Sequence, residues 1–364
     1  MSRQAARTRT DAGAAGDFAA RVLAWYDEHG RHDLPWQRPA TPYRVWISEV
    51  MLQQTRVETV RGYFAHFVER FPDVPTLAAA PLDDVLGHWS GLGYYARARN
   101  LHRAAQQMVS DHGGDLPDDI AALQALPGIG RSTAGAIQSL ARGRCEVILD
   151  GNVKRVLARH AGIEGWPGRS PVQRWLWAEA EARTPGQRTA AYNQAMMDLG
   201  ATLCLPRPQC EACPIAADCR ARLDGTTDTI PGRKPKRDLP TREAAVLLLQ
   251  RADGAILLER RPAHGIWGGL WSLPEFTSAE ELAAWLVARG IQTEPEPLAA
   301  VDHGFTHFRY RMHPHRVQTS GGDPVAGGVA EPDGHAWALP QEPPGGVPAP
   351  VSRLLRQHGP KRKP

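Results

Sequence analysis

The sequence has little lysine, few cysteines and no long apolar run. Only five of its 43 basic residues are lysines, and none precedes Lys154. A reaction that needs a lysine amine as nucleophile therefore has none available in the first 153 residues. No apolar stretch approaches the ~20 residues of a membrane span, and the opening MSRQAARTRT lacks the apolar segment of a secretion signal. These absences predict a cytoplasmic protein that is neither secreted nor membrane-bound.

The composition is that of a globular protein with more than one domain. The chain has 364 residues, of which 42% are hydrophobic and 23% charged. That length allows two or three domains, and the chain is too apolar to be disordered. The net charge of +4 is too small to identify a nucleic-acid binder by itself, so any DNA-binding surface must be local.

Four of the five cysteines lie within sixteen residues. Cys204, Cys210, Cys213 and Cys219 are separated by five, two and five residues. In a large chain without a signal peptide, such clustering favours a metal site over disulfides. Zinc binds four thiolates, and so does an iron–sulfur cluster. The spacing leaves both metals open.

The chain from Asp17 to about Arg222 has helical periodicity without sustained alternation, which predicts an all-α region. Thr41-Pro42 is typical of a helix start, and Glu49 follows on that helix among apolar residues. Between residues 120 and 141, the segment LPGIG predicts two short helices joined by a tight turn. Asp150 precedes apolar positions at helical spacing and therefore opens a further helix.

The composition changes after residue 225. Residues 226–240 mix prolines, threonines and basic residues, which predicts a linker between a domain at 17–225 and one at 241–356. Two strand-like runs then flank Asp253-Gly254, a strong hairpin signal.

The second domain should also contain a helix. Ser278 and Glu281 form a capping box for a helix that reaches about Arg289. From Pro340 onward, the many prolines and glycines predict a tail with little regular structure. The second domain is therefore expected to be mixed α and β.

Each candidate site has an ordinary structural interpretation beside the functional one. Gly128 and Gly130 could simply form a tight corner, or they could let backbone N–H groups approach a phosphate. Asp150 could be an ordinary helix N-cap, and Glu49 an exposed helix residue. Buried among apolar neighbours, Glu49 would instead have a raised pKa. One protonated and one ionised carboxylate can break a glycosidic bond, but spacing does not show that the two meet.

Five segments in a fixed order resemble the endonuclease III superfamily of base-excision DNA glycosylases. They are SEVMLQQT around Glu49, GLGYYARARNLH at 91–102, LPGIGRSTAGAI at 126–137, LDGNVKRV at 149–156 and the cysteine cluster. The resemblance covers roughly residues 18–320, and SEVMLQQT with the second domain resembles the MutY-type adenine glycosylases. The family's first cysteine gap is usually six residues, whereas residues 205–209 make five here.

The resemblance implies a fold, a cofactor and a substrate. The fold is an all-α helix-hairpin-helix glycosylase domain with a [4Fe–4S] cluster loop at 204–219, followed by an α+β Nudix (MutT)-like domain. The substrate is double-stranded DNA in which adenine is mispaired with 8-oxoguanine or guanine. A monomer should act on it, associated with the nucleoid.

The resemblance also implies a role for individual residues. Glu49 would protonate adenine N7, Asp150 would stabilise the positive charge that develops on the sugar, and Asn152 would orient the pair. The remaining DNA contacts implied are Gln37 and Gln194 on the adenine edge, Gly128 and Gly130 on phosphate, and Gln54, Thr55, Leu92 and Tyr94 inside the duplex.

Position 132 separates two reactions within the superfamily. Bifunctional members carry a lysine here, whose amine forms a Schiff base with the sugar and then cleaves the strand. This chain has Ser132, which favours a monofunctional glycosylase that leaves an intact abasic site. Ser132 would help to position Asp150 or would simply pack.

In the second domain, the resemblance assigns recognition of the opposite base to Phe305, Thr306 and His307. The family has serine in the middle of this loop, so a hydroxyl is kept and a methyl added. Oxidation at C8 makes N7 of guanine a donor, from which the Thr306 hydroxyl can accept. The helix expected after Ser278 has only Glu280 and Glu281 at its start, too few carboxylates for a pyrophosphohydrolase that holds Mg²⁺.

Three hypotheses therefore stand side by side. The first is an adenine glycosylase, the second an endonuclease III-like glycosylase and lyase, and the third a DNA-binding module without catalysis. Ser132 and the second domain disfavour the lyase, and the presence of both Glu49 and Asp150 disfavours the inactive module.

Overall fold

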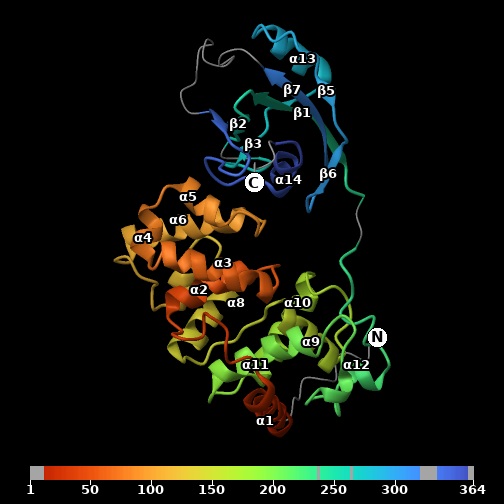
Figure 1. Cartoon of the computed structure of the whole chain (residues 1–364). Coiled ribbons are helices and arrows are strands. Elements are labelled where there is room, and N and C mark those ends of the chain that lie inside the picture. Colours follow the sequence, from red (N-terminus) through yellow and green to blue (C-terminus); the bar gives the residue numbers. More distant parts are fainter. Residues whose placement is uncertain (1–11, 236–237, 263–264, 320–333, 360–364) are drawn as a thin grey trace. The chain divides into compact units, whose positions relative to one another are not determined.

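The computed structural model describes residues 12–235, 238–262, 265–319 and 334–359 (Figure 1). The chain divides into two compact units, one formed by residues 1–79 and 100–236 and the other by residues 80–99 and 237–364. In the part of the chain that is described, no helix has both the length and the apolar character of a membrane span.

The chain before residue 237 is helical. The described residues form no strand before Thr241, which confirms the all-α prediction. In chain order, the helices are α1 (Ala12–His29), α2 (Pro42–Leu52), α3 (Val57–Arg70), α4 (Val74–Ala79), α5 (Leu82–His88), α6 (Ala96–Asp111), α7 (Ile120–Ala125), α8 (Arg131–Ala136), the π-helical η1 (Ile137–Ala141), α9 (Gly151–Ala161), α10 (Ser170–Arg183), α11 (Thr189–Thr202), the 3₁₀ turn η2 (Cys210–Ala212) and α12 (Arg220–Leu223).

The predicted helix starts are confirmed by their caps. The Thr41 side chain accepts a hydrogen bond from the N–H of Arg44 at 3.2 Å and caps α2. Asp150 caps α9 in the same way, because its Oδ1 accepts from the N–H of Val153 at 2.8 Å. Each cap satisfies a backbone donor that the first helical turn leaves unpaired.

Helices α9 and α11 form the centre of the helical core. Val153, Val156 and Leu157 of α9 are buried together with Leu199 of α11. The two helices approach closely at Gly200, where a Cβ atom would lie 2.6 Å from the Cβ of Asn152. Only glycine allows this contact. The buried Ile230, from the segment expected to be a linker, joins the same core.

The second unit contains a mixed sheet. Its strands are β1 (Thr241–Arg251), β2 (Ile256–Arg260), β3 (Trp271–Ser272), β4 (Glu275–Phe276), β5 (Glu296–Pro297), β6 (Val301–Gly304), β7 (Arg309–Thr319) and β8 (His335–Ala338). The order is β3-β2-β1-β7-β5, with β4 paired to β1, β6 to β7 and β8 to β2. The long central strands β1 and β7 are parallel. The hairpin predicted at Asp253-Gly254 is confirmed, because β1 and β2 pair antiparallel.

Two helices complete this unit. In α13 (Ala279–Val287), Ser278 Oγ accepts from the N–H of Glu281 at 3.2 Å, as predicted, but the helix ends two residues before Arg289. The prediction of an irregular tail from Pro340 was wrong, since Ala349–His358 forms α14. Buried apolar side chains on one face of α14 stabilise it, and proline is tolerated in a first helical turn.

Residues 80–99 are anchored to the second unit by polar contacts. Arg260 Nη2 lies 2.8 Å from Asp83 Oδ1. The Tyr95 hydroxyl donates to the carbonyl of Val347 at 3.0 Å, and Arg99 Nη1 donates to that of Gly268 at 2.8 Å. The loop 91–94 therefore belongs to the same unit as the loop 305–308.

Candidate active site and nucleic-acid interface

Two carboxylates from separate helices interact in the first unit. Glu49 lies on α2 and Asp150 caps α9. Burial, and after it the charge of Asp150, raises the pKa of Glu49 to about 8. The fold therefore brings these two groups within electrostatic reach, which their spacing in the sequence did not show.

The two carboxylates have different surroundings. Burial also raises the pKa of Asp150, but the backbone N–H groups of Val153 and Asn152 and the charges of Arg155 and Lys154 oppose that shift. Glu49 has no comparable opposing interaction. A proton shared by the pair therefore favours Glu49 near neutral pH, and Asp150 is the group that ionises first.

Ser132 contacts the segment that leads to Asp150. Its Oγ accepts a hydrogen bond from the N–H of Leu149 at 2.9 Å. Gly135, one turn later on α8, would place a Cβ atom 2.4 Å from the carbonyl oxygen of Val147. Helix α8 can therefore lie directly against the backbone before Asp150.

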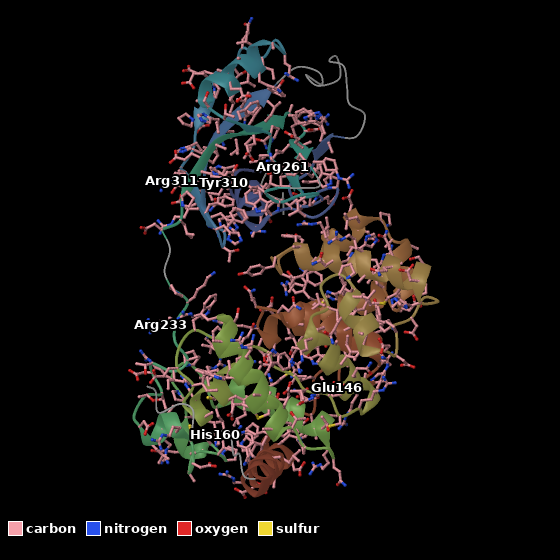
Figure 2. All side chains as sticks on the ribbon, turned by 180° about the vertical axis from the view of Figure 1, so that it is seen from behind. Glu146, His160, Arg233, Arg261, Tyr310 and Arg311 are labelled. Carbon is pink, nitrogen blue, oxygen red and sulfur yellow. The ribbon has the colours of Figure 1, made fainter. Side chains whose placement is uncertain are left out.

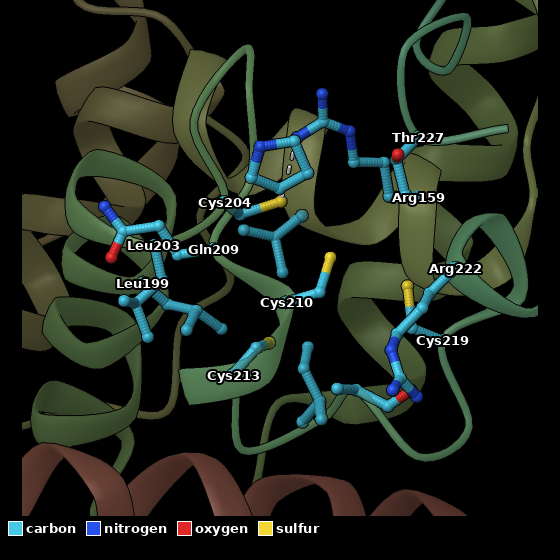
Figure 3. A pocket seen from close by; sticks show the side chains of 14 residues that line it. Arg159, Leu199, Leu203, Cys204, Gln209, Cys210, Cys213, Cys219, Arg222 and Thr227 are labelled. Atoms are coloured by element: carbon cyan, nitrogen blue, oxygen red, sulfur yellow. Dashed lines mark hydrogen bonds between the residues drawn. The ribbon is translucent and has the colours of Figure 1, made fainter. Parts of the chain in front are cut away.

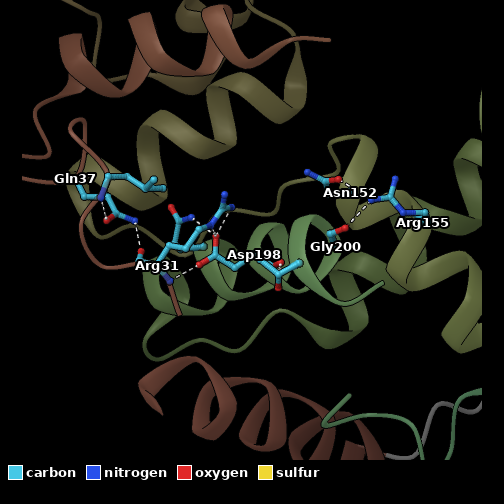
Figure 4. Close-up of polar contacts among 9 residues, drawn as sticks. Arg31, Gln37, Asn152, Arg155, Asp198 and Gly200 are labelled. Carbon is cyan, nitrogen blue, oxygen red and sulfur yellow. Dashed lines mark hydrogen bonds and ion pairs between the residues drawn. The ribbon is translucent and has the colours of Figure 1, made fainter. Parts of the chain in front are cut away.

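A chain of hydrogen bonds connects the start of α9 to the cysteine loop. Arg155 Nη2 donates to Asn152 Oδ1 at 2.8 Å and to the carbonyl oxygen of Gly200 at 2.6 Å (Figure 4). Its Nε donates to the carbonyl oxygen of Cys204 at 2.6 Å. The Asn152 side chain is thus held by an arginine that also contacts the cysteine loop.

The four clustered cysteines line one pocket (Figure 3). Helices α9 and α11 supply apolar walls to it, and all four cysteines are free thiols. Gln209 N–H donates to the carbonyl oxygen of Leu203 at 2.9 Å, which closes the loop across the short first gap. Among the residues described, no three His, Cys, Asp or Glu side chains converge on a single-ion site.

Arg159 is a buried charged residue in the lining of this pocket. Its Nη1 donates to Cys204 Sγ at 3.4 Å and to the carbonyl oxygen of Leu205 at 2.5 Å. Its Nε donates to the carbonyl of Ile230 at 2.8 Å. Burial raises the pKa of the Cys213 thiol to about 11. A cation bound in this pocket would favour the thiolate form of Cys213.

Two glycines and one tyrosine with left-handed backbone conformations shape the loop at 91–94. Gly91, Gly93 and Tyr94 all have positive φ, and the Tyr94 side chain is 54% exposed. Arg97 Nη2 donates to the carbonyl oxygens of Leu92 and Gly93, each at 3.2 Å. Leu92 is only 6% exposed, so Tyr94 is the side chain of this loop that projects into solvent.

The loop after α2 has a similar character. Gln54 is exposed with a φ of +60°, and its neighbour Thr55 donates its N–H to the carbonyl of Leu52 at 3.2 Å. A glutamine in the left-handed region is uncommon, and such conformations concentrate at functional sites.

The predicted helical hairpin is present between α7 and α8. Gly128 has a φ of +81°, and a Cβ atom there would lie 3.0 Å from the Cβ of Asn100. Gly130 precedes the first residue of α8 and has no atom within 4 Å of the equivalent position. The turn therefore needs glycine at position 128, while position 130 leaves open space in front of the helix N-terminus.

The loop between β6 and β7 has a rigid base and an exposed tip. Phe305 stacks on Phe308 with ring centroids 4.6 Å apart, and its N–H donates to the carbonyl of Phe308 at 2.9 Å. Trp267, with a φ of +54°, packs against Phe305. Thr306 and His307 are both exposed. Tyr310, labelled in Figure 2, extends this aromatic cluster, because its ring packs edge-on against that of Trp267.

Gln37 and Gln194 are connected through one ion pair. Gln37 Nε2 donates to the carbonyl of Arg31 at 2.8 Å, and Gln194 Nε2 donates to Asp198 Oδ1 at 2.8 Å. Arg31 and Asp198 pair with each other at 2.6 Å (Figure 4).

Sequence reasoning missed these connecting residues. Arg31, Asp198, Arg155 and Arg159 were not among the candidates, although Arg155 and Arg159 stand four residues apart on the amphipathic helix α9. Two arginines four residues apart among buried residues indicate that polar partners lie beneath that face of the helix.

The fold and the site define a class of protein. A family model described as HhH-GPD superfamily base excision DNA repair protein matches residues 47–181, and one for the NUDIX domain matches residues 245–357. The solved structure of a thermostable thymine-DNA glycosylase aligns with a TM-score of 0.52 at 27% identity, over 59% of this chain and 100% of that one. The class is a helix-hairpin-helix base-excision repair protein with an appended Nudix-like domain.

Curated relatives specify the family further. The adenine DNA glycosylase of Buchnera aphidicola subsp. Acyrthosiphon pisum is 40% identical over 299 residues, which are 82% of this chain and 85% of that protein. The human adenine DNA glycosylase is 35% identical over 389 residues, covering 89% of this chain and 70% of the human protein. The chain belongs to the adenine DNA glycosylase family and is an enzyme of base-excision repair.

Proposed function

We propose that the protein is a monofunctional glycosylase that removes adenine mispaired with 8-oxoguanine or guanine in double-stranded DNA. The observation that carries the proposal is the interaction of Glu49 with Asp150 and the raised pKa of Glu49, about 8. One carboxyl group that keeps its proton and one that ionises form the pair that glycosidic cleavage needs.

In the proposed reaction, the Glu49 carboxyl transfers its proton to adenine N7. The C1′–N9 bond breaks, and its electron pair leaves with the base as neutral adenine. The Asp150 carboxylate stabilises the oxocarbenium-like sugar. Water then supplies hydroxide to C1′, its proton returns to the Glu49 carboxylate, and the product is an abasic site. Asn152, held by Arg155, orients the Asp150 carboxylate.

The chemistry requires adenine to leave the base stack. The exposed Tyr94 is suited to enter the duplex because an aromatic ring replaces lost stacking. We assign Leu92 to supporting Tyr94, since Leu92 is buried, and assign Gln54 and Thr55 of the first unit to a DNA contact of their own. The backbone N–H groups of Gly128 and Gly130, in front of α8, are assigned to a phosphate.

The second domain is proposed to read the opposite base rather than to hydrolyse pyrophosphates. The exposed Thr306 hydroxyl accepts from N7–H of 8-oxoguanine, flanked by Phe305 and His307. Glu281 is not disposed as a Mg²⁺ ligand, because its Oε2 accepts from the N–H of Thr277 at 2.7 Å and caps α13. No larger carboxylate set is present on this helix in the described chain.

We infer that Cys204, Cys210, Cys213 and Cys219 hold a [4Fe–4S] cluster. The donor set fits, because four free thiols line one pocket and four thiolates are the ligands that such a cluster takes. When bound, the cluster would supply iron–thiolate bonds that tie residues 204–219 into one rigid loop. Arg159 donates to Cys204 Sγ and would lower the charge on that thiolate.

The bonding of Ser132 supports a monofunctional reaction. Its hydroxyl accepts from the N–H of Leu149 and carries no amine for a Schiff base. The lyase alternative therefore lacks its nucleophile at this position, and the inactive-module alternative does not account for the two interacting carboxylates.

The proposal is tested by measuring free base released from duplexes under single-turnover conditions. Adenine opposite 8-oxoguanine, guanine and thymine provides three substrates that differ only in the opposite base. Release of adenine in the order 8-oxoguanine, guanine, thymine supports the proposal. Release of another base, or equal rates on all three duplexes, would overturn it.

A further inference from the structure

A buried carboxylate, Asp198, accepts four hydrogen bonds. Three come from Arg31, through its backbone N at 2.7 Å, its Nε at 3.0 Å and its Nη2 at 2.6 Å. The fourth comes from Gln194 Nε2 at 2.8 Å. Asp198 is 0% exposed, so every one of these donors approaches it inside the protein.

The backbone carbonyl of Arg31 also takes part in the bonding of a loop. The carbonyl oxygen of Arg31 accepts from Gln37 Nε2 at 2.8 Å, and Gln37 Oε1 accepts from the N–H of Leu34 at 3.1 Å. Both ends of the Gln37 amide are therefore engaged with the loop at 31–37. Of the two glutamines assigned to the adenine edge, Gln194 is the one whose bonding leaves its oxygen for a ligand.

The Asp198 carboxylate determines which end of the Gln194 amide faces it, the NH₂ group or the oxygen. An ionised carboxylate only accepts hydrogen bonds, so the NH₂ group of Gln194 must face it. The amide oxygen then points to the opposite side as an acceptor. With the amide in the reverse orientation, two oxygens would face each other without a proton between them.

Helix α11 connects Gln194 and Asp198 to α9, the helix that begins after Asp150. Gln194 and Asp198 lie one turn apart on α11. Gly200 of the same helix contacts Asn152, and its carbonyl accepts from Arg155 at 2.6 Å. The position of the Gln194 amide is thereby tied to the helix that begins at Asp150. A buried ion pair is a weak device for stability, which favours an orienting role.

We propose that Asp198, paired with Arg31, is a positioning residue that sets base specificity: it fixes Gln194 so that its amide oxygen accepts from the amino group of adenine. The proposal rests on the proposed function, since it concerns how the same site selects its base. An exocyclic amino group satisfies the fixed acceptor, whereas a carbonyl at the same ring position meets it oxygen to oxygen.

The test compares three bases, each opposite 8-oxoguanine in an otherwise identical duplex. They are adenine, hypoxanthine, which has a carbonyl at position 6, and unsubstituted purine. In Asp198→Asn, the neutral amide accepts either orientation of Gln194. We expect the ratio of the adenine rate to the hypoxanthine rate to fall about tenfold, the effect of one hydrogen bond. The purine rate should change by less than about threefold.

Two further variants complete the test, one as a control and one as a substitute if Asp198→Asn does not fold. Asp33→Asn is the matched control, because Asp33 lies in the same loop and pairs with Arg61 at 3.0 Å on the surface. It should leave all three rates unchanged. If Asp198→Asn does not fold, the double variant Arg31→Met with Asp198→Asn removes both charges of the pair together, and its three rates are compared in the same way.

The outcomes separate this proposal from the proposed function. If the wild-type protein releases no adenine, the proposed function fails. If the wild-type protein is active and the folded Asp198 variant keeps its adenine-to-hypoxanthine ratio, the positioning role is overturned. An equal fall in all three rates also overturns it, since general structural damage does not distinguish the bases.

Discussion

The Ser132 hydroxyl oxygen accepts a hydrogen bond from the backbone N–H of Leu149, one residue before Asp150, at 2.9 Å. The second helix of the hairpin thus holds the segment that delivers the Asp150 carboxylate. The Ser132 hydroxyl thus bonds the backbone directly before Asp150.

Ser132→Ala should lower the single-turnover rate of adenine release about three- to tenfold, because one hydrogen bond near Asp150 is lost. Duplex affinity should stay within about twofold. Ser110→Ala, at an exposed serine on α6, is the control and should match the wild type. An unchanged rate in Ser132→Ala would show that Ser132 only packs.

Glu49→Gln should reduce adenine release by at least about a hundredfold, because glutamine keeps the shape but has no acidic proton to donate. Binding to the mispaired duplex, measured by fluorescence anisotropy, should change little. Glu58→Gln, at an exposed glutamate of α3, is the matched control. Equal losses of binding and base release would show that Glu49 has a structural role instead.

The rate of base release should depend on pH through Glu49. Since its pKa is about 8, the rate should fall above pH 8 by up to tenfold per unit as the donor ionises. Single-turnover rates between pH 6 and 9.5, with circular dichroism as a check on folding, measure this limb. A rate that stays constant or rises from pH 7.5 to 9.5 contradicts the assignment of Glu49 as the acid.

The same pKa predicts a change in stability. A carboxyl group whose folded pKa of about 8 exceeds the ordinary 4.5 imposes no penalty below pH 4.5 and a growing one as pH rises to 8. Glu49→Gln removes this penalty. Its free energy of unfolding should exceed that of the wild type by roughly 4 kcal/mol at pH 8.5, and by roughly 1 kcal/mol at pH 5.5. Denaturant titrations at the two pH values test this, and a difference that grows toward acid pH would refute it.

Thr306→Ala should reduce the preference for 8-oxoguanine over guanine about five- to tenfold, because the hydroxyl that accepts from N7–H is removed. Thr306→Ser keeps the hydroxyl and should retain the preference. The ratio of rates on the two duplexes is the measured quantity. If the alanine and serine variants behave alike, the hydroxyl does not read the lesion.

Local signals in the sequence predicted the ends of elements well. Thr41, Asp150 and Ser278 were each recognised as helix caps, since capping depends on a few adjacent residues. The helical end of the second domain was missed, because prolines and glycines before residue 349 concealed a short apolar periodicity in α14.

Contacts between distant segments were not predictable from spacing. The interaction of Glu49 with Asp150 depends on how α2 and α9 pack, and the pairing of Arg31 with Asp198 joins residues 167 positions apart. Arginines such as Arg155 resemble surface residues in sequence and become identifiable only when their carbonyl partners are known.

The most direct test is a single-turnover reaction on a duplex with one adenine opposite 8-oxoguanine, with half of each sample treated with hot alkali. Alkali breaks the strand only where an abasic site has already formed. Our account predicts strand breaks solely after alkali, at the position of the adenine. Breaks without alkali, or none in either sample, would contradict it.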